Sequence, residues 1–424
     1  MASDSTLPIH TNGVPPPPSS TSTYTAATLA IHADDSLNSS TDVAPALHVS
    51  TTFRYAHNPD DLVPALDEPP DSSDTNIPAP HVYSRLTAPN TSRLEAILSQ
   101  LLNGKALTYT SGLAAFHALL VFLRPKVIAI GEAYHGCHGL VTLHHNLHGL
   151  KVVDLHDEAA WDAAGLGKGD LVHVETPVNP TGEAVCIRRL ADLAHKRGAV
   201  LSVDATFAPP PLQDPFKEGA DIVMHSGSKY LGGHSDLLCG VLALRSERVE
   251  EGWWEGMWRE RLLLGAVMGS LEGWLGVRSL RTLELRVERQ SGNAEKLVGW
   301  LGGLLGGGVE GEEGALVRKA VARVRHASLQ KGEMGWLREQ MPGGFGPVFA
   351  IYMTTPELAK RLPSKLKLFH HATSLGGVES LIEWRRMSDA GVDERLLRVS
   401  VGVESWEDLR DDLLQGFKAL AGEE

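Results

Sequence analysis

Cysteine is scarce in this chain, since only Cys137, Cys186 and Cys239 occur among 424 residues. Three scattered cysteines are too few for a disulfide framework, and this usage suits a reducing compartment such as the cytosol. Runs of basic residues are also missing, and 52 acidic against 39 basic side chains give a net charge of −13. That balance argues against a nucleic-acid partner. No apolar run is long enough to cross a bilayer, so we expect no membrane partner either.

The N-terminal region has little that could form a core. It contains four consecutive prolines at 15–18 and many Ser and Thr residues, and it lacks the apolar segment of a signal peptide. We therefore interpret 1–77 as an arm whose first ~25 residues are disordered. The length of the whole chain predicts two or three domains.

From about residue 92 onward, helix-like and strand-like segments alternate. Ser92 and Glu95 form a capping-box pattern for a helix that we expect to end at Asn103 and Gly104. Short apolar runs predict buried strands at 127–130, 152–153, 171–174, 199–203 and 222–224. This alternation predicts a large α/β domain over 78–270 with a mostly parallel sheet.

The remaining part, 271–424, predicts a smaller α+β domain. Trp, Leu and Arg residues indicate long helices between about 250 and 300, and a Gly-rich patch at 302–314 indicates a loop. Strands are predicted near 348–352 and 396–401. The last helix is predicted to begin at Ser405, because acidic residues follow in its first turn, where the helix dipole favours them.

Lys229 carries the strongest functional signal in the sequence. It follows the apolar run 222–224 within the segment 225–233, and Ser226 and Ser228 lie beside it. A lysine at the end of a buried strand is costly to desolvate unless it is neutralised or bonded. A Schiff base with an aldehyde cofactor does both, and the serines suit a cofactor phosphate. Pyridoxal 5′-phosphate (PLP) is therefore the first hypothesis; a surface lysine in a turn is the alternative.

Other polar residues follow predicted strands and fit a PLP site. A Gly turn at 111–115 before a helix offers free backbone N–H groups to an anion. Tyr134 follows a strand and places a ring at the carboxyl end of the sheet. Asp204 ends another strand, where its carboxylate needs a cationic partner such as a pyridinium nitrogen. The turn at 175–182 would hold Asn179 against the cofactor.

Arg398 lies in a predicted strand of the C-terminal domain. Alternation places Arg398 and Ser400 on one face, with apolar neighbours on the other. An arginine fork suits the carboxylate of an amino acid. A solvated strand residue is the alternative interpretation.

These motifs, in this order, resemble the Cys/Met-metabolism family of fold-type I PLP enzymes. That family includes cystathionine γ-synthases, cystathionine γ- and β-lyases, methionine γ-lyases and O-acylhomoserine sulfhydrylases. The resemblance covers about residues 27–420 and implies a large domain with a mostly parallel seven-stranded sheet. Its motifs lie at 28–32, 50–53, 83–85, 111–115, 175–182, 204–206, 226–230, 374–381 and 398–402.

The resemblance also implies roles for single residues. It makes Lys229 and Tyr134 catalytic, with Tyr134 stacked on the cofactor ring. It implies an amino-acid substrate and a homodimer or homotetramer whose active sites are shared across subunits. Cofactor contacts are expected from Lys229, Tyr134, Asp204, Thr206, Asn179, Gly112, Leu113, Ser226, Ser228 and, across the subunit boundary, Tyr83 and Arg85. Substrate contacts are expected from Arg398, Ser374 and Glu175.

The sequence departs from the family pattern around the substrate. Ala205 replaces a common Asn, Thr373 stands where many members have Glu, and 382–387 replaces a proline-containing loop. We therefore expect an unaltered cofactor site and an altered substrate pocket.

A cluster of His and Cys residues between 135 and 148 has zinc-type ligands but no recognised zinc spacing, so we expect no metal. The leading prediction is a trans-sulfuration enzyme that carries out γ-replacement like a cystathionine γ-synthase. Elimination by a cystathionine γ- or β-lyase or a methionine γ-lyase remains open. A weakly catalytic PLP-binding protein and an aminotransferase are the alternatives of other kinds.

Overall fold

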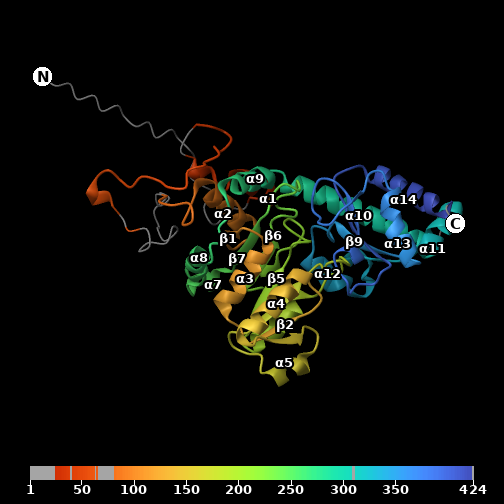
Figure 1. The fold of residues 1–424 in the computed structure, drawn as a ribbon, viewed down its shortest axis with the longest axis horizontal. Helices are drawn as coiled ribbons and strands as arrows, with labels where there is room; N and C mark the ends of the chain where they lie inside the picture. Colours follow the sequence, from red (N-terminus) through yellow and green to blue (C-terminus); the bar gives the residue numbers. More distant parts are fainter. Residues whose placement is uncertain (1–23, 39–40, 63, 65–80, 308–310, 423–424) are drawn as a thin grey trace.

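Two β-sheets and the helices around them form the molecule (Figure 1). The computed structural model describes residues 24–38, 41–62, 64, 81–307 and 311–422. The predicted disorder of the first ~25 residues falls almost wholly outside these ranges, and the proposed domain boundaries at 77 and 270 stay predictions.

The larger sheet has seven strands in the order β1-β7-β6-β5-β4-β2-β3. β7 pairs antiparallel with β1 and β6, and the remaining pairs are parallel, so the expected mostly parallel seven-stranded sheet is confirmed. The strands are β1 Lys105–Tyr109, β2 Val127–Ile130, β3 Lys151–Asp154, β4 Leu171–Glu175, β5 Val200–Asp204, β6 Ile222–Ser226 and β7 Gly240–Leu244.

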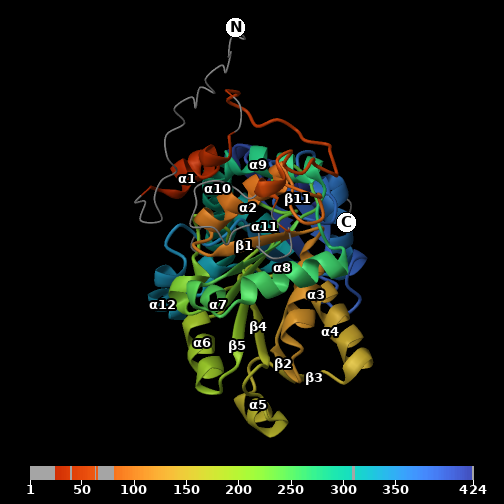
Figure 2. The ribbon, with the colours of Figure 1, turned by 90° about the vertical axis from the view of Figure 1, so that its left-hand side faces the viewer.

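Helices cover both faces of this sheet, which is why its central strands are apolar on both sides. Alternate strand residues pack on one face against α2, α5 and α6 and on the other against α3, α4 and α8; Figure 2 shows α6 opposite α3 and α4. The helices are α1 Ala26–His32, α2 Pro89–Leu101, α3 Gly112–Leu123, α4 His135–His148, α5 Glu158–Ala164, α6 Ile187–Lys196, α7 Ser246–Glu250, α8 Trp253–Leu264 and α9 Ser270–Leu280.

The smaller sheet has five strands in the order β10-β11-β12-β9-β8. Its strands are β8 Val321–Arg325, β9 Val348–Met353, β10 His370–His371, β11 Leu381–Trp384 and β12 Leu396–Ser400. The helices after α9 are α10 Leu283–Leu305, α11 Glu312–Ala320, α12 Met334–Gln340, α13 Pro356–Arg361 and α14 Trp406–Ala421. The predicted start of the last helix is confirmed, since Ser405 is the N-cap of α14.

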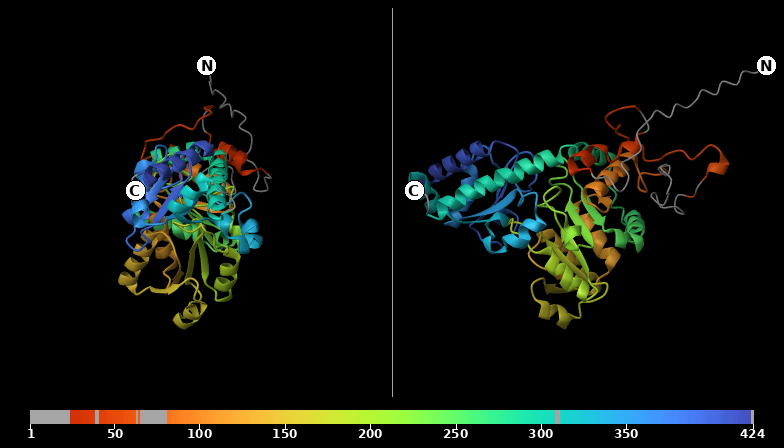
Figure 3. Two further views of the ribbon diagram at one scale, coloured as in Figure 1. Left: turned by 90° about the vertical axis from the view of Figure 1, so that its right-hand side faces the viewer. Right: turned by 180° about the vertical axis from the view of Figure 1, so that it is seen from behind.

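The long helix α10 joins the two parts of the molecule (Figure 3). Leu283 and Val287 near its start pack in the core of the large sheet, whereas Leu297 and Leu301 pack in the core of the small sheet. One rigid helix thus contributes to both cores.

Two local predictions were wrong. α2 begins at Pro89, because proline is pre-organised for the first helical position, so Ser92 and Glu95 lie inside the helix and form no capping box. Glu95 instead accepts hydrogen bonds from the backbone N–H and the hydroxyl of Thr108. The Gly-rich patch is not all loop, because α10 continues to Leu305; its buried apolar stripe outweighs the cost of about 1 kcal/mol for each helical glycine.

Within the described ranges, none of the helices combines the length and the hydropathy that a bilayer span requires. Cys137, Cys186 and Cys239 are all free thiols.

Candidate active site

A cavity of about 270 Å³ lies where the carboxyl ends of the large-sheet strands meet the segment before β11. It is lined by every residue predicted for the site except Tyr83 and Arg85. The lining residues are Ser111, Gly112, Leu113, Tyr134, His135, Cys137, Glu175, Asn179, Asp204, Thr206, Phe207, Met224, Ser226, Ser228, Lys229, Leu238, Thr373, Ser374, Leu375, Arg385 and Arg398.

Lys229 lies in the turn three residues beyond the end of β6. Its Nζ donates a hydrogen bond of 2.7 Å to Ser374 Oγ. Burial, with a further contribution from the nearby Arg398 guanidinium, lowers the pKa of Lys229 from 10.5 to about 8. A lysine amine that loses its proton this easily can act as a nucleophile and as a base near neutral pH.

The segment around Ser374, whose hydroxyl accepts the hydrogen bond from this amine, has an unusual backbone conformation. Ser374 has a φ of 81°, in the left-handed region that non-glycine residues rarely adopt. Gly376 follows at φ 87°, and a Cβ there would lie 2.8 Å from the carbonyl carbon of Lys229. The close approach of the two backbones requires glycine at this position.

An anion site lies at the start of α3. Ser111 caps the helix by accepting from the Ala114 N–H, which leaves the N–H groups of Gly112 and Leu113 ahead of the first intrahelical hydrogen bond. A Cβ on Gly112 would lie 3.1 Å from Ser226 Oγ, so the helix start and this hydroxyl are close together. The Ser228 hydroxyl, in contrast, accepts from the N–H of Cys239 and donates to its carbonyl.

Asp204 is fixed at the end of β5 by Thr206. Its Oδ1 accepts from the Thr206 N–H at 3.0 Å and from the Thr206 hydroxyl at 2.5 Å. The same hydroxyl oxygen accepts from the Ser226 N–H. Burial raises the pKa of Asp204 above its usual value, against the hydrogen bonds from Thr206. Asp204 Oδ2 lacks a partner in the described part of the chain and is suited to a cationic group.

Glu175 lines the cavity, and backbone N–H groups hold both of its carboxylate oxygens. Its two carboxylate oxygens accept from the backbone N–H groups of Tyr134 and Asn179, each at 2.7 Å. Parallel pairing of β4 with β5 sets Glu175 beside Asp204. Burial and then the Asp204 charge raise the pKa of Glu175 to about 8. This geometry positions Tyr134, whereas the predicted substrate contact stays a prediction.

Arg398 lies on β12 and is buried, so it is not a solvated strand residue. Its guanidinium donates to Asn179 Oδ1 at 3.1 Å and to the Ser374 carbonyl at 2.8 Å, and it pairs with Glu383 at 2.7 Å. The cross-strand register of β11 and β12 sets Glu383 opposite Arg398. Burial lowers the pKa of Arg398 to about 10, against the attraction of Glu383.

Sequence reasoning missed Glu383 and Arg385 as site residues. Glu383 Oε2 also pairs with Arg385 at 3.0 Å, so one carboxylate oxygen serves two guanidinium groups. The available signal was the charged Glu383 two residues before Arg385, directly after the apolar pair at 381–382, in a segment that departs from the family pattern.

Tyr83 and Arg85 do not line the cavity of this chain. The Arg85 guanidinium lies 5.3 Å from the centroid of the Tyr83 ring, and 43 % of Tyr83 is exposed. Their predicted contact with a neighbouring subunit's cofactor therefore stays a prediction.

The His and Cys cluster on α4 does not assemble a metal site. In the described part of the chain, no group of three His, Cys, Asp or Glu residues has metal-binding geometry. Instead His117, His144 and His148 form a hydrogen-bonded row between α3 and α4, with ring nitrogens 3.1 and 3.0 Å apart.

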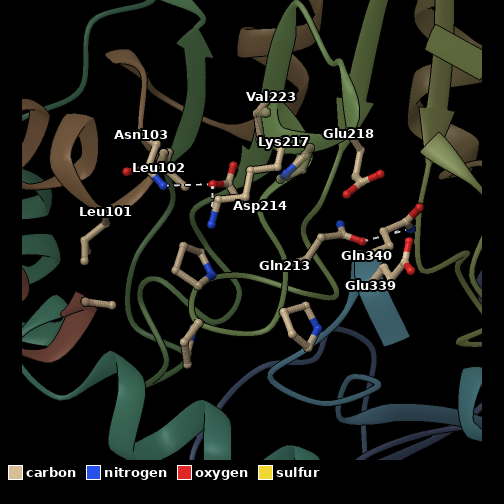
Figure 4. A pocket seen from close by; sticks show the side chains of 15 residues that line it. Leu101, Leu102, Asn103, Gln213, Asp214, Lys217, Glu218, Val223, Glu339 and Gln340 are labelled. Carbon is tan, nitrogen blue, oxygen red and sulfur yellow. Dashed lines mark hydrogen bonds and ion pairs between the residues drawn. The ribbon is translucent and has the colours of Figure 1, made fainter. Parts of the chain in front are cut away.

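A second pocket, of about 170 Å³, lies away from these residues (Figure 4). Its polar side chains are largely paired with one another: Asn103 with Asp214 at 2.9 Å and Gln340 with Gln213 at 3.1 Å. None of the predicted site residues lines it.

Comparison with known proteins identifies the family to which the chain with these site residues belongs. Residues 27–418 match the family described as Cys/Met metabolism PLP-dependent enzyme. The chain belongs to this family. It is 33 % identical to the cystathionine γ-synthase of Escherichia coli strain K12, over 89 % of this chain and 93 % of that protein. The same family resemblance extends to enzymes of other named activities.

A cystathionine β-lyase of Lactococcus lactis subsp. cremoris is 32 % identical over 80 % of this chain and 89 % of its own. The crystal structure of cystathionine γ-lyase from yeast superposes with a TM-score of 0.78 at 29 % identity, covering 94 % of this chain and 98 % of that one. This protein is therefore a PLP-dependent enzyme of the trans-sulfuration family, as the resemblance of its motifs predicted.

The residues present fit PLP. Free N–H groups at the start of α3 and the Ser226 hydroxyl suit its phosphate, the unpartnered Asp204 Oδ2 suits its ring nitrogen, and Lys229 suits its aldehyde. The groups that fit PLP come from the strands of the large sheet, from the turn after β6 and from α3, whereas Arg398 and Ser374 come from β12 and the segment before β11. We name the first group the cofactor end and the second, with Glu383 and Arg385, the substrate end, after their predicted roles.

Proposed function

We propose that this enzyme catalyses γ-replacement on an O-acylhomoserine with a thiol amino acid and so forms cystathionine, the compound for which its synthase relative is named. The observation that carries the proposal is the path from Lys229 Nζ through Ser374 to Arg398. It connects an amine that moves protons to a guanidinium that binds a carboxylate. Of the relatives compared above, the synthase has the highest identity, 33 % against 32 % and 29 % for the two lyases, which supports replacement over elimination.

Bound PLP supplies an electron sink that makes the Cα and Cβ protons of an amino acid acidic. The chain's own residues supply the rest. Arg398 orients the substrate carboxylate, and its links to Asn179 and Ser374 keep the guanidinium fixed. Lys229 Nζ takes the proton from Cα and returns it at neighbouring carbons, with Ser374 Oγ as its hydrogen-bond partner between transfers.

Asp204 would hold the protonated ring nitrogen, and Thr206 keeps its carboxylate in place. Glu175 fixes the backbone of Tyr134, whose ring would stack on the cofactor. Tyr83 and Arg85 are exposed and available to complete the phosphate site of a second subunit, so we propose a homodimer or homotetramer with shared active sites. The free thiols support a reducing compartment such as the cytosol.

Product analysis tests the proposal. PLP-loaded enzyme is incubated with an O-acylhomoserine and cysteine, and separately with cystathionine alone. Formation of cystathionine in the first reaction is the expected result. Release of a 2-oxo acid, ammonia and a thiol from cystathionine alone would favour the second candidate, elimination, which the lyase relatives make the main competitor. No turnover in either reaction would contradict both.

A further inference from the structure

A second arginine, Arg385, lines the cavity close to Arg398. It begins the short 3-10 helix Arg385–Met387 directly after β11, in the segment 382–387 that departs from the family pattern. Its side chain is only 4 % exposed. A buried guanidinium at a cavity wall needs a reason, because an uncompensated charge there is costly.

The two arginines differ in how fully their donors are used. Arg398 donates to three acceptors, on Asn179, Ser374 and Glu383. A guanidinium carries five N–H groups. Among the described residues, Arg385 donates from one nitrogen, Nη1, to one acceptor, Glu383 Oε2. The Nε of Arg385 is buried and has no hydrogen-bond partner in the part of the chain that the structure describes. Arg385 therefore keeps donor capacity that Arg398 has largely spent.

The local charge is also unbalanced. Among the described residues, Glu383 is the carboxylate that forms ion pairs with both guanidinium groups, and a single oxygen, Oε2, makes both contacts. Two guanidinium groups thus share one ion-paired carboxylate, and Glu175, which also lines the cavity, acts on Arg398 without forming an ion pair with it. An additional anion in the cavity would offset this charge and would accept from the Nη groups of Arg385, which lines the cavity, although not from its buried Nε. An arginine fork matches a carboxylate or phosphate.

We propose that Arg385 is a specificity-determining residue that binds a second anionic group of the substrate, at the far end of its side chain. The preferred substrate is then an amino acid with a terminal carboxylate or phosphate, such as a homoserine ester of a dicarboxylic acid or of phosphoric acid. This inference rests on the proposed function only for the identity of the ester. The extra anion itself follows from the cavity.

A purely positioning role gives a different expectation. If Arg385 acts only by holding Glu383 and through it Arg398, its loss weakens the binding of every amino-acid substrate to the same degree. If Arg385 contacts the substrate, its loss weakens the binding of only those substrates that carry the second anion. The comparison of charged with neutral ligands therefore separates the two roles.

The first test measures binding to the PLP-loaded enzyme by cofactor absorbance, with L-2-aminoadipate against L-norleucine. We expect the charged ligand to bind roughly tenfold to a hundredfold more tightly than the neutral one. Arg385→Gln should remove this preference and leave norleucine binding unchanged, and Arg385→Lys should keep part of it. Arg386→Gln is the matched control, because Arg386 pairs with Glu394 and does not line the cavity.

Equal weakening of both ligands by Arg385→Gln, no preference in the wild type, or an unaltered preference in Arg385→Gln would overturn the proposal. Retained norleucine binding shows that the variant is folded. A second test compares kcat/KM for O-succinyl-, O-phospho- and O-acetylhomoserine, which separates a carboxylate from a phosphate as the preferred anion. Should no ester be turned over, the proposed function fails while the binding test still decides the role of Arg385.

Discussion

The two ends of the active-site cavity differ in how their carboxylates are held. At the cofactor end, hydrogen bonds join Asp204 Oδ1, Thr206 and Ser226 on neighbouring strands of one sheet, while Asp204 Oδ2 has no partner among the described residues. At the substrate end, one oxygen of Glu383 serves two arginines, and in the described part of the chain Glu383 Oε1 and Arg385 Nε are buried without partners. A carboxylate with one open oxygen suits a cofactor with a cationic ring nitrogen, and two guanidinium groups that share one carboxylate suit a substrate that brings another.

The largest effect is expected at the amine that joins the two ends. Lys229→Ala should lower kcat by at least about a thousandfold, because both the attachment point of PLP and the proton carrier are lost. Initial-rate assays with PLP-saturated protein measure this. Lys217→Ala is the matched control, since the Lys217 side chain is 77 % exposed, and its activity should equal that of the wild type. A Lys229 variant with near-normal kcat would contradict the assignment.

The next effect concerns the substrate end. Arg398→Met should raise KM by about a hundredfold or more, since a charge-assisted bond to the substrate carboxylate is lost. Removing one member of a buried ion pair should also lower the free energy of unfolding, by roughly 3 kcal/mol or less because Glu383 keeps Arg385. Steady-state kinetics and urea unfolding measure the two quantities. A changed kcat with an unchanged KM would place Arg398 outside the substrate site.

At the cofactor end, Asp204→Asn should lower kcat by roughly a hundredfold while KM stays within a few fold. The neutral amide no longer favours a protonated ring nitrogen, whereas Arg398 still binds the substrate. Parallel measurements of kcat and KM test this contrast with Arg398→Met. Similar effects of the two variants on KM would remove the distinction between the two ends.

The pH dependence of PLP uptake gives a smaller but direct test. Burial, then Arg398, lowers the pKa of Lys229 from 10.5 to about 8 in the PLP-free protein. The deprotonated amine is the reactive form, so the rate of uptake should rise with pH, reach half its maximum near pH 8 and level off above it. A rate that still rises steeply at pH 10 would show a lysine with its usual pKa.

The smallest effect is expected from the backbone that brings Ser374 to Lys229. Gly376→Ala should destabilise the protein by about 1–3 kcal/mol, because φ is 87° and the added Cβ meets the Lys229 backbone. Gly299→Ala, on the exposed side of α10 with no atom near its Cβ, should instead stabilise by about 1 kcal/mol or less. Denaturant midpoints compare the two, and equal midpoints would argue against strain at Gly376.

The cofactor end could be predicted from the sequence because its residues follow strands. Parallel strands bring their carboxyl ends to one edge, so Asp204, Glu175 and Lys229 could be placed together from the chain order alone. The substrate end could not, because the pairing of β11 with β12 that sets Glu383 opposite Arg398 depends on register across a second sheet. Glu175 shows the same limit: its backbone partners arise from tertiary contacts that no local pattern contains.

Borohydride reduction of the PLP-saturated protein, followed by peptide mass mapping, tests the central claim most directly. The account predicts a pyridoxyl adduct on Lys229 and on no other lysine, together with a change in the visible spectrum when an O-acylhomoserine or cystathionine is added. An unmodified Lys229 in protein saturated with PLP would contradict it.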